Sequence, residues 1–454
     1  MTRLIRPPTK PTMLKPPQLD IETTPVTLSE WEHVEPVSRQ QLMGTTLKSN
    51  PAAQELSNAL RSQVDIREGY KGLEVSTTSF VGHIAVGPLR ININPKLQGL
   101  SLTTLVRYAY GLRDLKVFGQ TLTPTAQYGL HDVLISLLAA EVEELLHQGL
   151  LRRYVPVSEK LASPRGRVLV EKIASRGGIV DGALPCLHFQ RHANWKLNQV
   201  LRSGLEFAGS MTADRDLHRR VRRLADAFDT VEAKTKLQQG DLDEVERGLT
   251  RLTATSKPAL TLIRLLFGMH GTSLETVTSS HRTPGFLFDM NFFFQRLLSR
   301  FLRENLDYHS IKDEHATKGM FGYAPNGNPK GRSLPRPRPD FALFEANELI
   351  GFLDAKYRDV WEKGYPAGWL YQLSMYALAS PNQKSILLYA TTSPGAREER
   401  IDIRHPVFLR AGSESSVIMR PVQLQTLATL LAPSGVTSAD NEQRKNFARS
   451  LVAF

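Results

Sequence analysis

The chain has 454 residues, of which 41% are hydrophobic and 22% charged, a balance that is typical of a globular protein and excludes a mainly disordered one. Its formal net charge of +12 favours an anionic partner, most commonly nucleic acid, although a basic surface can also serve only solubility. The single cysteine, Cys186, excludes a disulfide framework and a cysteine-rich zinc site and fits a cytoplasmic location, where we expect it to be a small core residue.

The N-terminal part of the sequence contains a tail and then regular elements. The first 25 residues are basic and rich in proline, which predicts a disordered tail, and no apolar run reaches the roughly 18 residues that span a bilayer. Between residues 64 and 97 apolar and polar side chains alternate with a period of two, which predicts a small β-rich module. Residues 101–112 and 130–151 have helical periodicity, the second with acids opposite its apolar face and a stop at Gly149. We assign residues 26–190 to one N-terminal region.

Residues 191–280 are predicted to form a helical region. Within it the run ADRDLHRRVRRLADAF mixes charges of both signs, which indicates a solvated helix face rather than a nucleic-acid patch. The last domain is predicted to start near residue 281 with an apolar, aromatic helix over residues 284–305, in which Phe292, Phe293 and Phe294 are expected to be core. A basic loop rich in Gly and Pro follows, and then two strands and another helix.

The stretch RPDFALFEANELIGFLDAKY, residues 338–357, predicts a β-hairpin with its turn at Ala346 and Asn347. In this register Glu345 faces Glu348, and Asp340 falls opposite Leu353, one residue short of Asp354. A bulge or a longer turn would bring Asp340 and Asp354 side by side. Asp354 and Lys356 are two residues apart and therefore project from the same face of their strand.

Two carboxylates and one ammonium group thus converge on this hairpin. Mutual repulsion disfavours two neighbouring carboxylates unless a cation lies between them, and Mg²⁺ prefers such hard oxygen ligands. We therefore predict that Asp354 binds metal and that Lys356 orients or helps to deprotonate an attacking water. The alternative is a hairpin on which Asp354 and Lys356 form an ordinary exposed salt bridge.

Residues around the hairpin are candidates for accessory roles. Gln372 and Tyr376 lie one helical turn apart, so Gln372 could reach a phosphate or the attacking water, and Gln295 is a weaker candidate of the same kind. Five cations crowd the loop before Asp340 and are predicted to contact DNA phosphates, unless the loop is only a solvated linker: Lys318, Lys330, Arg332, Arg336 and Arg338. No G-x-x-x-x-G-K-[ST] motif occurs, so we expect no P-loop nucleotide site in this chain.

At these residues the sequence resembles a known family. FLFDMNFFFQRLL, RPDFALF, FLDAKYR and LYQLSMYALAS, together with VGHIAVGPLRININPKL and CLHFQRHANWKLNQVLRSGLE upstream, resemble McrC, the nuclease subunit of McrBC-type modification-dependent restriction systems. The resemblance covers about residues 60–430. It implies catalytic roles for Asp340, Asp354, Lys356 and Gln372 and a metal site at Asp340, Asp354 and Ala355. Many relatives carry an acid where this chain has Gln295, which leaves open whether one or two metal ions bind.

The resemblance also implies a division of labour with an AAA+ GTPase ring, McrB, that reads methylated DNA. It implies an α+β multidomain chain: a β-rich docking module within residues 26–190, a helical middle region, and an α/β PD-(D/E)xK nuclease domain at residues 281–454. We expect partner docking through residues 64–97 and the basic turn of Arg165 and Arg167. The expected function is a Mg²⁺-dependent DNA endonuclease of a 5-methylcytosine-type restriction complex that is activated by, and stimulates, this ring. The alternatives are a non-catalytic adaptor of a ring NTPase and a DNA repair nuclease without a motor.

Overall fold

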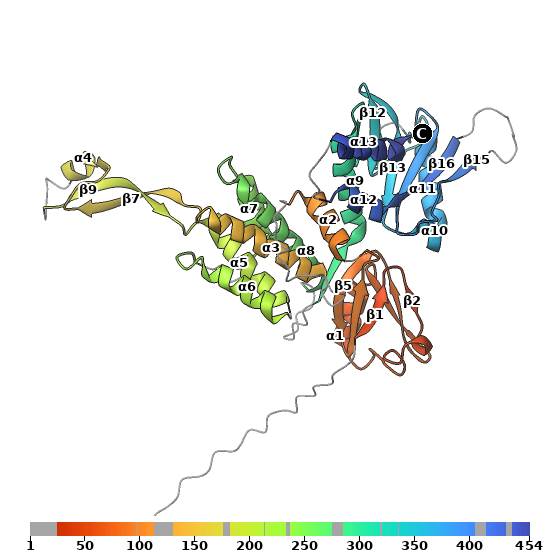
Figure 1. Cartoon of the computed structure of the whole chain (residues 1–454), viewed down its shortest axis with the longest axis horizontal. Coiled ribbons are helices and arrows are strands. Elements are labelled where there is room, and N and C mark those ends of the chain that lie inside the picture. The colour runs from red at the N-terminus through yellow and green to blue at the C-terminus, as the bar shows by residue number, and fades with distance from the viewer. Residues whose placement is uncertain are drawn as a thin grey trace, which may run out of the picture.

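The N-terminal module contains two small sheets (Figure 1). One has the strand order β1 (Val26–Ser29), β6 (Leu89–Asn94), β5 (Phe80–Val86) and β10 (Phe286–Asp289), and the other the order β2 (His33–Val34), β4 (Gly72–Thr77) and β3 (Val64–Gly69). Helix α1 (Pro51–Ala59) packs against β3 and β5. Burial alternates along these strands with a period of two, so the predicted β-rich module is confirmed.

The structure is a computed structural model that describes residues 25–97, 99–112, 130–175, 182–212, 214–232, 237–274, 285–317, 320–334, 336–404, 415–432 and 438–454. The predicted tail lies outside these residues, except for residue 25. Among the described helices, none is both long enough and apolar enough to cross a membrane.

Strand β10 was not predicted, and it connects two parts of the chain. The segment expected to be helical from residue 284 begins as this strand, which pairs antiparallel with β5, and Asp289 then caps the N-terminus of helix α9 (Met290–Asn305). The pairing requires a glycine on β5, because a Cβ at Gly82 (φ +138°) would lie 2.1 Å from the carbonyl oxygen of Phe286. The N-terminal sheet therefore leads directly into the first helix of the C-terminal domain.

The helical body lies beside this module (Figure 1) and consists of α2 (Gly99–Tyr110), α3 (Leu130–His147), α5 (Lys196–Met211), α6 (Arg215–Asp226), α7 (Gln239–Arg247) and α8 (Lys257–Leu274). The solvated face of α6 is confirmed, since Leu217 and Val221 are buried whereas Arg222 and Arg223 are exposed. The predicted acidic outer face of α3 is wrong at Asp132 and Glu141, which are buried because α5, α6 and α8 enclose that helix.

A β-hairpin arm, described over residues 153–175 and 182–192, projects from the helical body to the far left of Figure 1. Strands β7 (Arg153–Leu161) and β9 (Leu184–His192) pair along their whole length, and β8 (Arg167–Val168) and α4 (Val170–Ala174) lie on β9. Cys186 is fully buried, as predicted. The arm itself was not predicted, and the basic turn with Arg165 and Arg167 belongs to it.

The C-terminal domain is built on a six-stranded mixed sheet of order β11 (His309–Asp313), β12 (Phe341–Glu345), β13 (Glu348–Lys356), β14 (Lys384–Thr391), β16 (Ser415–Gln423) and β15 (Glu399–Ile403). Strands β13, β14 and β16 are parallel, and the other pairs are antiparallel. One face packs against α9, α12 (Leu424–Leu430) and α13 (Ser438–Val452), and the other against α10 (Val360–Lys363) and α11 (Ala367–Ala379). This arrangement buries β13 and β14 on both faces.

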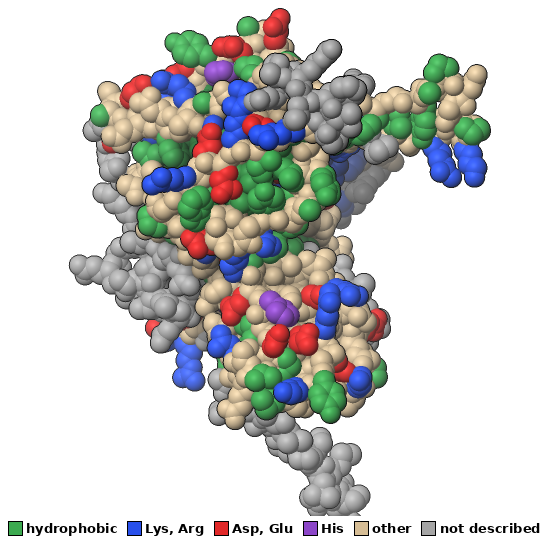
Figure 2. Space-filling model, turned by 90° about the vertical axis from the view of Figure 1, so that its right-hand side faces the viewer, with side chains coloured by type: hydrophobic (Ala, Val, Ile, Leu, Met, Phe, Trp, Pro, Cys, Tyr) green, Lys and Arg blue, Asp and Glu red, His purple; other side chains and the backbone are tan. Residues whose placement is uncertain are grey.

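Aromatic and apolar residues of this domain are not all in the core. Phe293 and Phe294 are buried, as predicted, but Phe292 is 53% exposed, so its predicted core position is wrong. It sits on the face of α9 that turns away from the sheet. Tyr371, Met375 and Leu378 on α11 are exposed too, and Figure 2 shows hydrophobic side chains gathered on the surface of the C-terminal domain, in the upper half of the view.

Candidate active site

The hairpin β12–β13 has the register that the sequence required for two adjacent carboxylates. Glu345 pairs with Glu348, and the two turn residues, Ala346 and Asn347, have φ of +46° and +68°, as a tight two-residue hairpin turn demands. The register then shifts between Leu343 and Phe344, where β13 contains an extra residue. Phe341 consequently pairs with Leu353, and Asp340, the residue before it, lies level with Asp354. The predicted bulge is confirmed.

The two carboxylates and the ammonium group converge as predicted. Lys356 Nζ lies 2.6 Å from Asp354 Oδ2 and 3.9 Å from Asp340 Oδ2. Asp340 Oδ2 also accepts a hydrogen bond from the Ala355 N–H at 2.8 Å, which fixes the carboxylate against the neighbouring strand. Gln295 reaches the same group from α9, since its Nε2 donates to Asp340 Oδ1 at 3.1 Å.

Burial makes this group of charges different from a surface ion pair. Asp354 is only 2% exposed, so the alternative of an ordinary exposed salt bridge is wrong. Burial, together with the charge of Asp354, raises the pKa of Asp340 to about 7. Burial by itself would lower the pKa of Lys356, but the charges of Asp354 and Asp340 outweigh it and leave this pKa raised. Lys356 is therefore an ammonium group, suited to orienting a water or anion rather than to removing a proton.

The donor set suits a hard divalent cation. Two carboxylates lie side by side, and one of them prefers to hold a proton when no other cation compensates its charge. Within the described ranges no cluster of three or more His, Cys, Asp and Glu residues could hold a metal ion. Mg²⁺ needs fewer protein ligands, because it retains several waters and commonly takes one or two carboxylates. Asp340, Asp354 and the Ala355 carbonyl could therefore hold Mg²⁺.

Helix α11 contributes a second layer beside Lys356. Gln372 Nε2 donates to the Tyr376 hydroxyl at 2.9 Å, so the expected pair on one helix face is confirmed. Burial raises the pKa of Tyr376, and the charges of Asp354 and Asp340 add to this effect. Trp369, which the sequence did not single out, lies with its ring centroid 5.8 Å from Lys356 Nζ. The sequence could have indicated Trp369 as a site residue through its position one helical turn before Gln372.

The basic loop is tied down close to Asp340. The N–H and the hydroxyl of Thr317 both donate to the Pro337 carbonyl, at 3.1 and 3.0 Å, and so close the base of the loop. Lys318 lies outside the described residues. The remaining predicted cations are exposed, and none forms an ion pair with any other residue that the structure describes: Lys330, Arg332, Arg336 and Arg338.

The segment after Lys356 is held by the N-terminal module, through contacts that the sequence did not reveal. Lys96 Nζ donates to the Tyr357 carbonyl at 2.6 Å, and the Lys96 N–H donates to Glu30 Oε1 at 2.8 Å. Lys363 Nζ donates to the Glu30 and Trp31 carbonyls at 3.2 and 2.9 Å. We call these contacts the Lys96 clamp. They fix the end of the strand that carries Asp354 and Lys356.

The clamp contains an unusual acid. Burial raises the pKa of Glu30 to about 7, although the charges of Lys96 and Lys363 oppose this shift. Burial likewise lowers the pKa of Lys96, which Glu30 and Asp359 counteract. Lys96 follows directly on the NINP end of β6, and its position after a strand was the one hint in the sequence.

Comparison with known proteins gives a family and a fold. The model of the family described as "McrBC 5-methylcytosine restriction system component" matches residues 75–390. No curated protein matches the chain significantly. Among solved structures, the chain is similar to one in the refined half-complex from the tetradecameric assembly of Thermococcus gammatolerans McrB AAA+ hexamers with bound McrC.

That similarity has 18% sequence identity and a TM-score of 0.62, over 94% of this chain and 99% of the other. A chain of the cryo-EM structure of the Thermococcus gammatolerans McrBC complex matches with 20% identity and a TM-score of 0.43, over 62% of this chain and 88% of the other. The first likeness supports the α+β fold over nearly the whole length. The family model covers well over half of the sequence, and this chain therefore belongs to the McrBC family of 5-methylcytosine restriction system components.

Proposed function

We propose that this chain is the Mg²⁺-dependent DNA endonuclease subunit of a methylation-dependent restriction complex, with a C-terminal domain of the PD-(D/E)xK type. The observation that carries the proposal is the convergence of Asp340, Asp354 and Lys356 at the start and end of one buried hairpin. A buried pair of acids is costly to the fold, as the raised pKa of Asp340 indicates, and a functional site is a common reason for such a cost. Family membership sets the biological context.

The residues divide the work of phosphodiester hydrolysis among them. Asp340, Asp354 and the Ala355 carbonyl would hold Mg²⁺, which when bound supplies a Lewis acid and lowers the pKa of a coordinated water. The Lys356 ammonium group points at both carboxylates and would orient the water and offset negative charge that develops on the phosphate. Trp369 limits the directions that Lys356 can take, and Gln372 would reach the phosphate or the water from the open side of α11.

The proposed partner is an AAA+ GTPase ring of the McrB type. The solved assembly with the similar fold is described as McrB AAA+ hexamers with bound McrC. The sequence of this chain contains no P-loop, so nucleotide hydrolysis and the reading of 5-methylcytosine would belong to the partner. The arm projects from the helical body (Figure 1) and suits docking, because the exposed Arg165 and Arg167, just before and within β8, could reach a nucleotide site in trans.

Coupled purification and cleavage would test this function. The chain is co-expressed with the AAA+ protein of its own system, and cleavage of methylated and unmethylated plasmid is followed with GTP and Mg²⁺. We expect cleavage only of the methylated plasmid, with loss of cleavage in chelator and in Asp354→Asn. Cleavage that survives in Asp354→Asn, or that needs no divalent metal, would contradict the assignment of this site.

One observation favours the adaptor alternative. Gln295 places an amide against Asp340, where an acid would be a better metal ligand. A pure adaptor would still bind the ring and stimulate its GTP hydrolysis but would never cut DNA. The same experiment separates the two functions, because GTP hydrolysis and plasmid cleavage are measured on one sample.

A further inference from the structure

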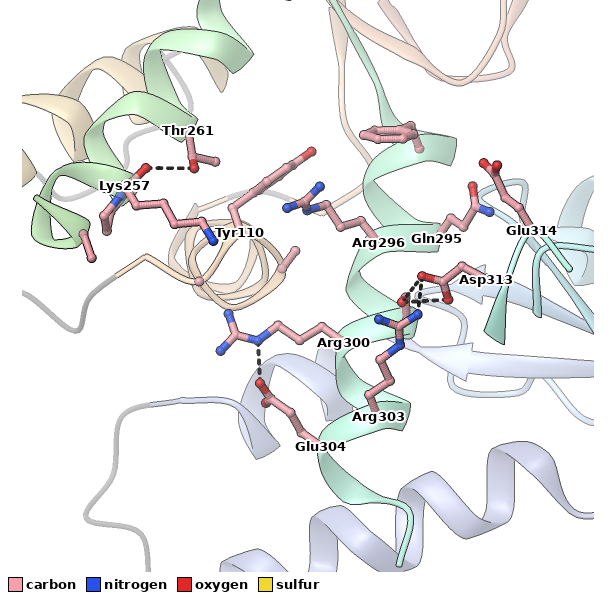
Figure 3. Close-up of a pocket in the computed structure, with 16 residues that line it drawn as sticks. Tyr110, Lys257, Thr261, Gln295, Arg296, Arg300, Arg303, Glu304, Asp313 and Glu314 are labelled. Carbon is pink, nitrogen blue, oxygen red and sulfur yellow. Dashed lines mark hydrogen bonds and ion pairs between the residues drawn. The ribbon is translucent and has the colours of Figure 1, made fainter. Parts of the chain in front are cut away.

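A cavity of about 760 Å³ lies between α2, the start of α8 and the outer face of α9, beside β11 (Figure 3). The helix α9 supplies one wall, with Phe292, Gln295, Arg296, Ser299, Arg300 and Arg303 at helical spacing. The opposite face of α9 is buried in the core, whereas on this face Arg296 and Arg300 lie over the rings of Tyr110 and Tyr108 at the end of α2. We call this cavity the α9 groove.

Unpaired positive charge distinguishes the α9 groove from an ordinary polar crevice. Arg300 is paired with Glu304 and Arg303 with Asp313, each at 2.7 Å. Lys257 and Arg296 have no carboxylate partner in the described parts of the chain, and the Arg296 guanidinium carbon instead lies 5.0 Å from the ring centroid of Tyr110. The groove thus carries two cations that are available to an anionic ligand, against one lining carboxylate, Glu314, that has no cation partner among the described residues.

The α9 groove lies next to the candidate active site. Gln295 lines it and also donates to Asp340 Oδ1 at 3.1 Å. Glu314, which lies near Gln295 in Figure 3, donates its backbone N–H to the Asp340 carbonyl at 3.0 Å. The exposed ring of Phe292 stands one turn before Gln295 and Arg296. Phe292 thus lies on one side of Gln295 along α9 and Arg296 directly beside Gln295 on the other, so a strand that passes the active site would be within reach of both an aromatic ring and a cation.

We infer that the α9 groove holds the DNA strand beside the bond that is cut, with Phe292 stacking on a base and Arg296 and Lys257 contacting phosphates. Exposed aromatic rings next to cations are the common means of holding a single strand without sequence preference. From Phe292 to Arg303 the helix face extends about 16 Å at 1.5 Å per residue, which matches a few nucleotides. This inference rests on the proposed function and extends the substrate contact beyond the basic loop before Asp340.

Binding of single-stranded DNA by the full chain tests the inference separately from cleavage. The probe is a fluorescent oligonucleotide containing 2-aminopurine, titrated in Ca²⁺ buffer at several salt concentrations. For Lys257→Gln with Arg296→Gln we expect about tenfold weaker binding, and a slope of log K against log salt reduced by about 1.4, the value for two single-strand phosphates. For Phe292→Ala we expect about tenfold weaker binding and less 2-aminopurine quenching, with the slope unchanged.

Matched controls separate the outcomes. Arg222→Gln with Arg223→Gln removes two exposed cations from α6, which contributes no residue to this groove, and should leave the slope unchanged. Arg296→Lys keeps the positive charge, so its slope of log K against log salt should stay close to that of wild type. A double variant of Lys257 and Arg296 that behaves like the α6 control, or a wild type without measurable binding, overturns the inference. Cleavage that persists in Asp354→Asn overturns the proposed function instead, whatever the groove variants do.

Discussion

Two antiparallel hairpins in this chain have opposite environments. The hairpin β12–β13 lies inside a six-stranded sheet, and most of its side chains are buried, including Asp354. In the arm, strands β7 and β9 are each longer than β12. Cys186 and His188 are nevertheless the only buried residues of the arm among those described. Tyr154 and Phe189 on the arm are 61% and 63% exposed. The third strand of its sheet, β8, has only two residues, so little apolar surface is covered and the arm stands to gain from a partner.

The difference indicates that the candidate catalytic residues and the candidate docking residues lie on separate hairpins. Charges on the hairpin β12–β13, which we call the inner hairpin, are held at fixed distances by the sheet, the Lys96 clamp and Gln295. Charges on the arm, such as Arg165 and Arg167, point into solvent and can adapt to another surface. Substitutions on the first hairpin should thus alter cleavage, and substitutions on the second should alter assembly.

The largest effect is expected at the inner hairpin. Asp354→Asn and Lys356→Ala should each lower plasmid cleavage at least about 100-fold, because each removes a charge that positions the reacting groups. Binding to the ring partner should be unchanged. The matched control is Glu348→Gln at the exposed start of the same strand, which should cleave like wild type. Cleavage by Lys356→Ala at the wild-type rate would show that the buried ion pair is structural.

The next effect is expected on the arm. Arg165→Glu with Arg167→Glu should lower the stimulation of GTP hydrolysis about tenfold or more, because two cations that could enter a nucleotide site become acids. The control is Arg222→Glu with Arg223→Glu on α6, which makes the same change of charge elsewhere. Unaltered stimulation in the arm variant would place the docking surface on the N-terminal module. Deletion of the whole module is a poorer test, because Lys96 and β5 support the C-terminal domain directly.

A change at Gln295 would sharpen the description of the metal site. Gln295→Glu replaces the amide that donates to Asp340 with a third carboxylate. We expect the thermal midpoint of the metal-free protein to fall, because the new charge repels Asp340 and Asp354. Affinity for Mn²⁺, measured calorimetrically, should rise about tenfold. A variant with unchanged metal affinity would mean that position 295 does not face the bound ion.

The smallest effect concerns the clamp that anchors the inner hairpin. Glu30 has an ordinary pKa of 4.5 that burial raises to about 7, so the folded protein keeps a proton that the unfolded chain loses. The free energy of unfolding should therefore fall as pH rises from about 4.5 to about 7. In Glu30→Gln this contribution is absent, so the thermal midpoint should fall less between pH 5 and pH 8 than that of wild type, by roughly 3–5 °C. Equal pH profiles for the two proteins would refute the raised pKa.

The sequence predicted the inner hairpin well because its features are local. The turn at Ala346 and Asn347, the spacing of Asp354 and Lys356, and the need for a bulge all lie within 20 residues, and the structure agrees with each. Local periodicity also predicted the β-rich module and the outer face of α6. Roles of the site residues in metal binding and cleavage remain predictions.

Features that depend on distant contacts were missed. The pairing of β10 with β5, the Lys96 clamp and the α9 groove each join residues about 200 or more positions apart, which no periodicity within a segment can reveal. Phe292 was predicted to be core together with Phe293 and Phe294. Its exposure follows from the rotation of α9 on the sheet, which tertiary packing alone decides.

The late arrival of β10 has a consequence for folding during synthesis. Strands β1, β5 and β6 are complete by residue 94, but the edge of β5 is unpaired until residues 286–289 have left the ribosome. An unpaired edge strand is a template for pairing between chains, and N-terminal segments of large proteins generally fold first. Truncated products that end before residue 286 should therefore aggregate through β5, and a peptide with the β10 sequence, supplied in trans, should protect them.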